Sequence, residues 1–337
     1  MKAVMLHAYG DAEALRVEEV VKPLPGAGEV LVRIEAASVN YADIVRRRGD
    51  PYPLPTPLPA ILGSEAAGVI DAVGEGVTAL HRGDRVFAFF GGPGLGGYAE
   101  YALAGAGDVI KLDPGLDLDV ASTLVVAGVT AFQMLKEAGR LEPGESVFIP
   151  GGAGGVGRYA IQLAKILGAD CVIAGASTPE RRQQALARGA DHAVDYTDPD
   201  WPREVKRLTG GRGADVVLDM VGGSFFDQAL AALAPFGRLV VYGSASRRPS
   251  SLIAQRLLPM NQAVIGYYVS HWFKARPDQA QKAFDTVAGL VAEKRLHVEI
   301  AGRLPLEAAS EAHRIMEARQ STGKYVLKPS LTGHVEI

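Results

Sequence analysis

Residues 145–174 constrain the fold of this chain more than any other stretch. They read ESVFIPGGAGGVGRYAIQLAKILGADCVIA. An apolar run at 147–149 enters a glycine-dense turn at 151–157, and a helical pattern of apolar residues follows directly, ending at Gly168. Glycine permits a sharp turn and a close approach of the backbone to a phosphate, and the N-terminus of the next helix offers free N–H groups to an anion. The stretch predicts a strand, a tight turn, a helix and a second strand, as in a dinucleotide-binding site.

A glycine turn before a helix also occurs where it serves packing alone, so the surrounding pattern has to decide. Further strand-like runs follow at 192–195, 215–221, 238–243 and 263–268. Helical segments separate them, at 179–188, 201–208 and 224–233. Strands and helices that alternate at this length predict an α/β domain with a doubly wound parallel sheet.

The remainder of the chain differs in texture from this central part. Residues 1–120 contain short strand-like runs between Gly/Pro turns, which favours a compact antiparallel or barrel-like domain. The alternating pattern occupies 121–262. The tail, 263–337, has two helical patterns at 277–294 and 306–319 and a strand-like run at 324–328. It is small for a domain, and we expect it to pack back onto the first one.

Composition excludes several functional classes. The chain has 337 residues and 48% hydrophobic residues, enough for two cores, and its 35 basic and 38 acidic residues give no overall attraction for nucleic acid or an anionic membrane. The run Arg46–Arg48 is interpreted as a solvated helix edge. No apolar stretch reaches 18 residues and no signal-peptide core opens the chain, so we expect a cytoplasmic protein. A single cysteine, Cys171, excludes an intrachain disulfide.

Several separate motifs, in order along the chain, carry a family resemblance. They are AASVNYADIVRRRG, LPAILGSEAAGVIDAVGEGV, GDRVFA, GGYAEY, GVTAFQML, the glycine turn, GADVVLDMVGG and GKYVLKP. With them the chain resembles the zinc-free quinone oxidoreductase branch, which includes zeta-crystallin, of the medium-chain dehydrogenase/reductase superfamily. The resemblance implies a GroES-like catalytic domain, a Rossmann domain, a returning C-terminal segment and a cofactor cleft between the two domains. It also implies a homodimer or homotetramer.

The zinc question decides the chemistry that the resemblance implies. Catalytic zinc needs thiolate and imidazole ligands, and structural zinc needs four cysteines. Asn40 and Ser64 stand where this resemblance would place zinc ligands, and no two of the seven histidines fall into a short ligand spacing. We expect no metal site, and we interpret Glu65 as a buried carboxylate that accepts hydrogen bonds from neighbouring donors. Without a Lewis acid, conjugated acceptors such as quinones or α,β-unsaturated carbonyls are favoured.

Three residues are candidates for the reacting centre. Asn40 resembles the family asparagine beside the nicotinamide and the acceptor, where its amide can donate to a quinone oxygen; alternatively it only fixes a strand-to-helix turn. Thr130 resembles the threonine that holds the nicotinamide carboxamide, although a helical threonine can bond its own backbone instead. Tyr52 lies where related enzymes place an acceptor-site tyrosine. Val45 replaces a second tyrosine that some relatives carry.

The expected cofactor is NADPH. An NAD-specific fold places an acidic residue at the end of the second strand, and here Ala176 holds that position. The adjacent arginines can bind a 2′-phosphate, unless they simply lie on a solvated helix face. The resemblance also implies a tyrosine beside this phosphate and a backbone segment under the nicotinamide ribose. The predicted cofactor-binding residues are Ala153, Gly154, Gly155, Val156, Gly157, Ser177, Arg181, Arg182, Tyr196, Gly243 and Ser244.

The sequence thus predicts an NADPH-dependent, zinc-independent quinone reductase that acts on a small molecule. One rival keeps the fold and cofactor but reduces the C=C bond of an enone, alkenal or enoyl thioester. A rival from another class is a nucleotide-binding structural or RNA-binding protein of the crystallin type with little turnover. The balanced charge and the lack of a stripe of basic and aromatic residues argue against RNA binding.

Overall fold

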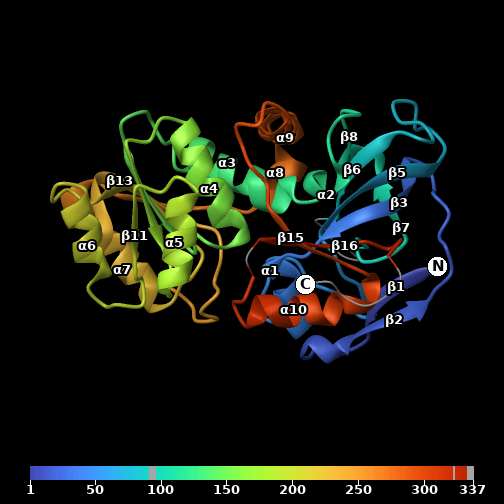
Figure 1. The fold of residues 1–337 in the computed structure, drawn as a ribbon, viewed down its shortest axis with the longest axis horizontal. Helices are drawn as coiled ribbons and strands as arrows, with labels where there is room; N and C mark the ends of the chain where they lie inside the picture. The colour runs from blue at the N-terminus through green and yellow to red at the C-terminus, as the bar shows by residue number, and fades with distance from the viewer. Residues whose placement is uncertain (91–95, 322, 332–337) are drawn as a thin grey trace. The chain divides into compact units, whose positions relative to one another are not determined.

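The computed structural model describes residues 1–90, 96–321 and 323–331, and Figure 1 shows the fold. Tertiary contacts divide the chain into two compact units. Unit 1 combines residues 1–126 with the described residues from 270 onward, and unit 2 is Ala127–Val269. Unit 2 thus begins six residues later and ends seven residues later than the predicted 121–262. The shift arises because helix α2 (Leu118–Ala121) packs on strands of unit 1, whereas β14 (Ala263–Gly266) pairs with β13 of unit 2.

Unit 2 contains one sheet of six parallel strands. In spatial order they are β11 (His192–Val194), β10 (Cys171–Gly175), β9 (Ser146–Pro150), β12 (Ala214–Asp219), β13 (Leu233–Val241) and β14. The chain moves outward from β9 to β11, returns to β12 and moves outward again to β14. That reversal between β9 and β12 is the doubly wound topology, so the predicted α/β fold class is confirmed.

Helices cover the sheet of unit 2 (Figure 1). Helix α4 (Gly155–Ile166) and helix α5 (Pro179–Ala187) are joined by a hydrogen bond from Arg158 to Gln184. Helices α6 (Trp201–Leu208) and α7 (Ser224–Ala232) contact each other. Trp201 of α6 stacks between Phe148 of β9 and Phe225 of α7, with ring centroids 4.6 and 5.1 Å apart. These rings belong to a buried apolar cluster that also includes Ile173, Val205 and Leu239. These helices and strands hold the carboxyl ends of β9, β10, β12 and β13 at one edge of the sheet.

Unit 1 is built mainly on antiparallel strand pairs, with one parallel pair. Its larger sheet runs β15 (Ile300–Leu304), β16 (Lys324–Leu327), β3 (Glu29–Ser38), β5 (Glu65–Val73), β6 (Arg85–Phe89) and β8 (Val109–Lys111), and β7 (Tyr101–Gly105) also pairs with β3. A smaller sheet joins β2 (Leu15–Glu19), β1 (Lys2–Leu6) and β4 (Ala60–Ile61). Alternating apolar residues of both sheets form the core. Because β16 pairs with β3, the C-terminal segment completes the first sheet.

The helices of the C-terminal segment include α8 (Val269–Ala275), α9 (Pro277–Ala292) and α10 (Ala309–Glu317). The last of these packs against α1 (Tyr41–Arg48), near the other end of the sequence. The prediction that the arginines of α1 form a solvated edge is wrong: Arg46 is 2% exposed and Arg47 0%. Arg47 is buried because Glu317 of α10 accepts a 2.7 Å hydrogen bond from its Nη2. The guanidinium of Arg46 instead lies over the ring of Tyr52, 4.3 Å from its centroid.

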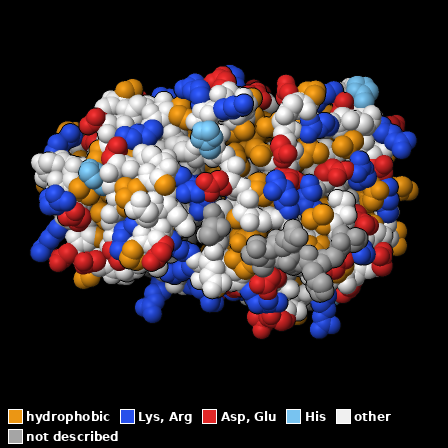
Figure 2. All heavy atoms as spheres, viewed as in Figure 1, with side chains coloured by type: hydrophobic (Ala, Val, Ile, Leu, Met, Phe, Trp, Pro, Cys, Tyr) orange, Lys and Arg blue, Asp and Glu red, His pale blue; other side chains and the backbone are white. Residues whose placement is uncertain are grey.

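Among the described residues, no helix is long and apolar enough to cross a membrane. Figure 2 shows acidic and basic side chains interspersed over the face that it draws, without a broad patch of one sign. This distribution agrees with the near balance of 35 basic and 38 acidic residues.

Candidate functional site

All of the predicted cofactor-binding residues follow strands that end at one edge of the sheet in unit 2. Each group follows the carboxyl end of a parallel strand, and parallel strands end at the same edge of a sheet. In an open α/β sheet, ligands bind at this edge where the strand order reverses. The residues are Ala153–Gly157 after β9, Ser177, Arg181 and Arg182 after β10, Tyr196 after β11, and Gly243 and Ser244 after β13.

The glycines of the turn have different local roles. A Cβ on Gly157 would lie 2.2 Å from the carbonyl oxygen of Gly151, so Gly157 lets α4 start directly against the turn. A Cβ on Gly152 would lie 2.8 Å from the Cβ of Ala174 on β10. Gly154, by contrast, is exposed and its Cβ would meet only the Gly151 oxygen, at 3.1 Å. It precedes α4, whose first N–H groups lack intrahelical acceptors. Packing therefore requires Gly157 and Gly152, while Gly154 leaves room for a ligand.

The two predicted arginines, Arg181 and Arg182, follow β10 and make different contacts. Arg182 donates from Nη1 to the Ala176 carbonyl at 3.1 Å and to Asp195 Oδ2 at 2.9 Å, so it ties β10 to the turn after β11. Bonds from Thr197 and Arg182 lower the pKa of Asp195 and keep it ionised. Arg181 forms no ion pair with any described residue, and its backbone N–H contacts the Thr178 hydroxyl at the start of α5. Of the two arginines, only Arg182 has a partner ion among the described residues.

The neighbouring residues complete this edge. Tyr196 packs edge-to-face on Phe225 with centroids 5.9 Å apart. Gly243 lies against Met220, since its Cβ would be 2.9 Å from the Met220 carbonyl oxygen, and Ser244 is exposed. Sequence reasoning missed Asp219, the last residue of β12. Its Oδ1 accepts hydrogen bonds from the N–H groups of Val221 and Gly222, and burial raises its pKa. Its buried Oδ2 has no hydrogen-bond partner among the described residues.

Thr130 is the first residue of α3 (Thr130–Gln133) in unit 2 and is buried. Its side chain hydrogen bonds with Tyr267, whose hydroxyl also donates to Gln133 Oε1 at 2.8 Å. Burial raises the pKa of Tyr267, which keeps its hydroxyl protonated as a donor. Tyr267, the first residue after β14, thus holds the Thr130 side chain in place.

In unit 1 the strand register builds a polar cluster around Asn40. β3 pairs with β16 through Val326↔Ser38 and with β5 through Ala37↔Ala66. Continuing these antiparallel registers places Lys324 opposite Asn40 and Glu65 opposite Ser38. Side chains two residues apart on a strand share a face, so all four converge. The convergence is not visible in the sequence, because Asn40 and Lys324 are 284 residues apart.

The Asn40 side chain is held at both ends. Lys324 Nζ donates to Asn40 Oδ1 at 2.6 Å, and Asn40 Nδ2 donates to Ser38 Oγ at 3.0 Å and Glu65 Oε1 at 3.1 Å. Ser38 Oγ itself donates to Glu65 Oε1, so these two acceptors lie together on one side of the amide nitrogen. Asn40 also precedes α1 and its N–H donates to Asp43 Oδ2, so it fixes the strand-to-helix turn as well.

Glu65 and Lys324 are buried charges, 0% and 6% exposed. Glu65 accepts from the Ser38 hydroxyl, from Asn40 and from the Val126 N–H, as expected for a carboxylate among neighbouring donors. Burial raises the pKa of Glu65 and lowers that of Lys324, and their attraction across 3.9 Å opposes both shifts. Removal of either partner would leave an uncompensated buried charge.

A chain of hydrogen bonds leads from this cluster to helix α10. Ser64 Oγ donates to Asp43 Oδ1 at 2.6 Å, and the Tyr98 hydroxyl donates to Asp43 Oδ2 at 3.0 Å. His313 Nε2 lies 3.2 Å from the Tyr98 hydroxyl, and its Nδ1 lies 3.4 Å from Arg47 Nη1. Because arginine can only donate, Nδ1 accepts and Nε2 carries the proton. Ser64 is therefore an oriented hydroxyl bound to a carboxylate.

Acid stability should depend on His313. Burial, reinforced by Arg47, lowers the pKa of His313 from 6.5 to about 3. Between these values only the unfolded chain binds the proton, so this contribution to stability is complete above pH 6.5 and is lost as the pH falls. The loss reaches up to about 1.4 kcal/mol per pH unit. We expect His313→Gln to flatten the dependence of Tm on pH between 7 and 4.5, and parallel curves for the two proteins would contradict this.

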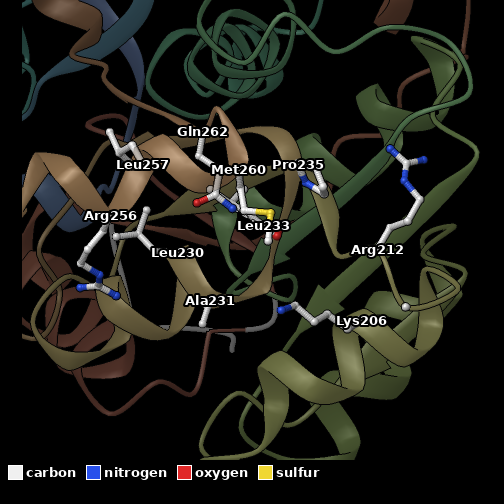
Figure 3. A pocket seen from close by; sticks show the side chains of 11 residues that line it. Lys206, Arg212, Leu230, Ala231, Leu233, Pro235, Arg256, Leu257, Met260 and Gln262 are labelled. Carbon is white, nitrogen blue, oxygen red and sulfur yellow. Dashed lines mark hydrogen bonds between the residues drawn. The ribbon is translucent and has the colours of Figure 1, made fainter.

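Tyr52 lies in a segment without regular structure after α1. The buried Arg46 stacks on its ring and donates from Nη1 to Thr56 Oγ1 at 3.0 Å. No described residue accepts a hydrogen bond from the buried Nε of Arg46. A cavity of about 540 Å³ occurs elsewhere, near the first residues of β12 and β13, at the end of the strands opposite to the glycine turn (Figure 3). None of the predicted site residues lines it; its walls include Lys206, Arg212, Leu233 and Met260.

Comparisons with known proteins agree with this architecture. Residues 26–114 match a family model described as the alcohol dehydrogenase GroES-like domain, and residues 155–289 match one described as zinc-binding dehydrogenase. A quinone oxidoreductase of Pseudomonas aeruginosa is 35% identical over 333 residues, covering 97% of this chain and 99% of the relative. This chain belongs to the quinone oxidoreductase branch of the medium-chain dehydrogenase/reductase superfamily.

Other members of the superfamily extend the comparison. A 2-haloacrylate reductase from Burkholderia sp is 35% identical over 337 residues, covering 97% of this chain and 98% of the relative. The crystal structure of an Escherichia coli quinone oxidoreductase complexed with NADPH superposes with a TM-score of 0.90 at 29% identity, covering 98% and 100% of the two chains. The predicted combination of GroES-like and Rossmann folds is confirmed, and the chain is an oxidoreductase of this superfamily.

Proposed function

We propose that this protein is an NADPH-dependent, zinc-independent reductase that transfers a hydride to a quinone-like acceptor. The observation that carries the proposal is the chemistry around Asn40 and Ser64, the positions that resemble zinc ligands. Asn40 is bonded to Lys324 and Glu65, and Ser64 donates to Asp43. An amide and a hydroxyl committed in this way are poor zinc ligands. Among the described residues, no group of three or more His, Cys, Asp or Glu side chains is arranged to hold a metal ion.

The edge of the sheet in unit 2 fits NADPH. Gly154 leaves space where a pyrophosphate can approach the start of α4, Ala176 brings no acidic side chain, and Arg181 has no partner ion among the described residues. NADPH bound here supplies the hydride. Thr130, anchored by Tyr267, would hold the carboxamide, and the backbone at Gly243 and Ser244 would support the ribose. The resemblance gives Asn40 a role beside the acceptor, and precise orientation would be the main contribution of the protein.

Conjugated acceptors suit a site of this kind. Hydride arrival at a quinone or an enone places negative charge on an oxygen that shares it with a π-system, so the metal that stabilises a developing alkoxide is not required. The second candidate, reduction of an activated C=C bond, draws support from the similarity to a 2-haloacrylate reductase. Both reactions would use the same cofactor edge, and we expect them to differ in the acceptor site, which the resemblance places beside Tyr52.

The test is NADPH oxidation with 1,4-benzoquinone, 9,10-phenanthrenequinone, 2-hexenal and crotonyl-CoA, followed by absorbance. We expect turnover with the quinones to exceed that with the other two acceptors by at least about tenfold. The reverse order assigns the protein to C=C reduction. NADPH binding without turnover of any acceptor assigns it to the nucleotide-binding class with a structural role.

Chelation should leave the enzyme intact. We expect prolonged treatment with EDTA to change neither the quinone reductase activity nor Tm, because Asn40 and Ser64 are committed to hydrogen bonds within unit 1. Elemental analysis before and after treatment is the control. Stoichiometric zinc that leaves together with activity would overturn zinc independence.

Preference for NADPH over NADH should depend on Arg181. We expect the unmodified protein to bind NADPH at least about tenfold more tightly than NADH, and Arg181→Ala to remove most of this difference by losing a charge-assisted contact with the 2′-phosphate. Arg182→Ala is the matched control: it breaks the bond to Asp195 and should lower Tm while the preference persists. Fluorescence titration measures both affinities, and equal values in the unmodified protein would refute the NADPH assignment.

We also propose a homodimer that forms through the edge of β14. This strand is the last of the six, and no described strand pairs with its outer edge. The preceding segment exposes Ile253 (64%), Leu258 (72%) and Met260 (49%). An uncovered strand edge beside apolar side chains favours pairing with a second copy. Light scattering should give twice the 35.5 kDa of one chain, and Leu258→Glu should shift the mass to that of one chain. A monomer in the unmodified protein would exclude the dimer.

A further inference from the structure

We propose that Lys324 is a positioning residue for the reaction: it fixes the orientation of the Asn40 amide at the acceptor side of the site. The inference rests on the proposed function, because it gives Asn40 a place beside the acceptor. It adds to that function a residue from the far end of the chain, which no motif around Asn40 indicates.

The first argument is that Lys324 determines which way the amide points. The two ends of an asparagine side chain have nearly the same shape, so their bonding partners decide the orientation. Lysine can only donate, and Lys324 Nζ lies 2.6 Å from Asn40 Oδ1. Glu65 can only accept when ionised, and it lies 3.1 Å from Asn40 Nδ2. With a donor on one side and an acceptor on the other, a single orientation satisfies both.

The second argument concerns rigidity. Lys324 Nζ also donates to the Val39 carbonyl at 3.3 Å, so it is bonded to the backbone next to Asn40 as well as to its side chain. Lys324 lies on β16, and the carbonyl oxygen of the next residue, Tyr325, accepts a hydrogen bond from the Val39 N–H at 2.9 Å. Its position is therefore set by the sheet and not by a mobile loop. A polar side chain held by a strand in this way keeps its place without reorganisation during a reaction.

The third argument is that the charge of Lys324 is not explained by stability alone. An ion pair removed from water often contributes less than a well-packed apolar pair would. Lys324 and Glu65 are both buried, and their closest approach is 3.9 Å, longer than a hydrogen bond. Lys324 makes its shortest contact with Asn40 Oδ1, and Glu65 accepts from Asn40 Nδ2 on the other side, beside its bonds from Ser38 and Val126. The geometry thus directs both charges at the amide.

A double-mutant cycle tests whether Lys324 acts through Asn40. The cycle comprises the unmodified protein, Lys324→Met, Asn40→Ala and the double variant, each assayed with NADPH and the acceptor of the panel that it reduces fastest. We expect Lys324→Met to lower kcat about tenfold with the KM for NADPH unchanged within twofold. Once Asn40 is absent, Lys324→Met should lower kcat by less than twofold. A kcat within twofold of the unmodified value, or a double variant that equals the product of the two single losses, would overturn the proposal.

A matched control and a fallback keep the test decisive. Lys328 lies next to the end of β16 and pairs with Asp119, away from Asn40, so Lys328→Met should leave kcat within twofold. If Lys324→Met does not fold, the same cycle is measured in the Glu65→Gln background, where no uncompensated carboxylate remains. If no acceptor is reduced, the proposed function fails by itself. Tm is then measured for the four proteins of the cycle. We expect the fall in Tm of the double variant to be smaller than the sum of the falls of the two single variants, and a fall equal to that sum would overturn the link to Asn40.

Discussion

Replacing Gly154 with valine is expected to weaken NADPH binding by at least about a hundredfold, or roughly 3 kcal/mol. The new side chain would occupy the space where a pyrophosphate approaches the start of α4. The fold should tolerate the change, because Gly154 has an extended backbone (φ −81°, ψ 172°) and its Cβ would meet only the Gly151 carbonyl oxygen, at 3.1 Å.

Two measurements on Gly154→Val distinguish a turn that binds the cofactor from one that serves packing alone. They are the NADPH dissociation constant by fluorescence and Tm without cofactor. Gly107→Val is the matched control, since a Cβ on Gly107 in unit 1 would meet nothing within 4 Å, and it should leave the affinity unchanged. A Gly154→Val protein that melts far lower yet binds NADPH normally would show that the turn serves packing and that the cofactor site lies elsewhere.

Gly157→Ala should have the opposite profile. A single methyl group at this position would lie 2.2 Å from the Gly151 oxygen and 2.8 Å from the Gly152 Cα, both of them backbone atoms that cannot move aside separately. We expect a loss of about 3 kcal/mol or more in the free energy of unfolding, seen as a fall in Tm of roughly 6–12 °C.

The same substitution elsewhere provides the comparison. Gly289 lies inside α9, and a Cβ there would meet nothing within 4 Å, so Gly289→Ala should raise stability by up to about 1 kcal/mol through helix propensity. Calorimetry on both variants is sufficient. If Gly157→Ala melts at the temperature of the unmodified protein, the contact between the turn and α4 is not what the structure indicates.

The fold of unit 2 could be predicted because its signals are local. The glycine turn, the apolar strand runs and the helical periods between them each lie within a short stretch, and parallel strands bring their ends together without further information. The candidate cofactor residues after β9, β10 and β13 share one edge for that reason. The division of labour between Arg181 and Arg182 could not be predicted, since it depends on Asp195 from the next strand.

The polar cluster of unit 1 was beyond sequence reasoning because its partners are distant along the chain. Asn40 was singled out, but Lys324, Tyr98 and His313 were not, since nothing near Asn40 marks them. The arginines of α1 were misassigned for the same reason: a run of charges on a short helix is typical of a solvated face, and only α10 supplies the partner that buries Arg47. The only sequence signal for Lys324 is its place in the motif GKYVLKP. The pairing register of β16 with β3 is needed to show that this lysine lies opposite Asn40.

That register has a consequence for how the protein is made. Unit 2 comes from one continuous stretch, so its whole sheet has left the ribosome before the last strand of unit 1 is synthesised. After Asn40 is synthesised, 284 further residues are added before Lys324 is reached. This synthesis takes roughly 15 to 60 s at an elongation rate of about 5–20 residues per second. During that interval β3 has an open side where β16 will pair, and Glu65 lacks its cation. The GroES-like unit of the nascent chain is therefore completed by β16 after the Rossmann unit has had time to fold.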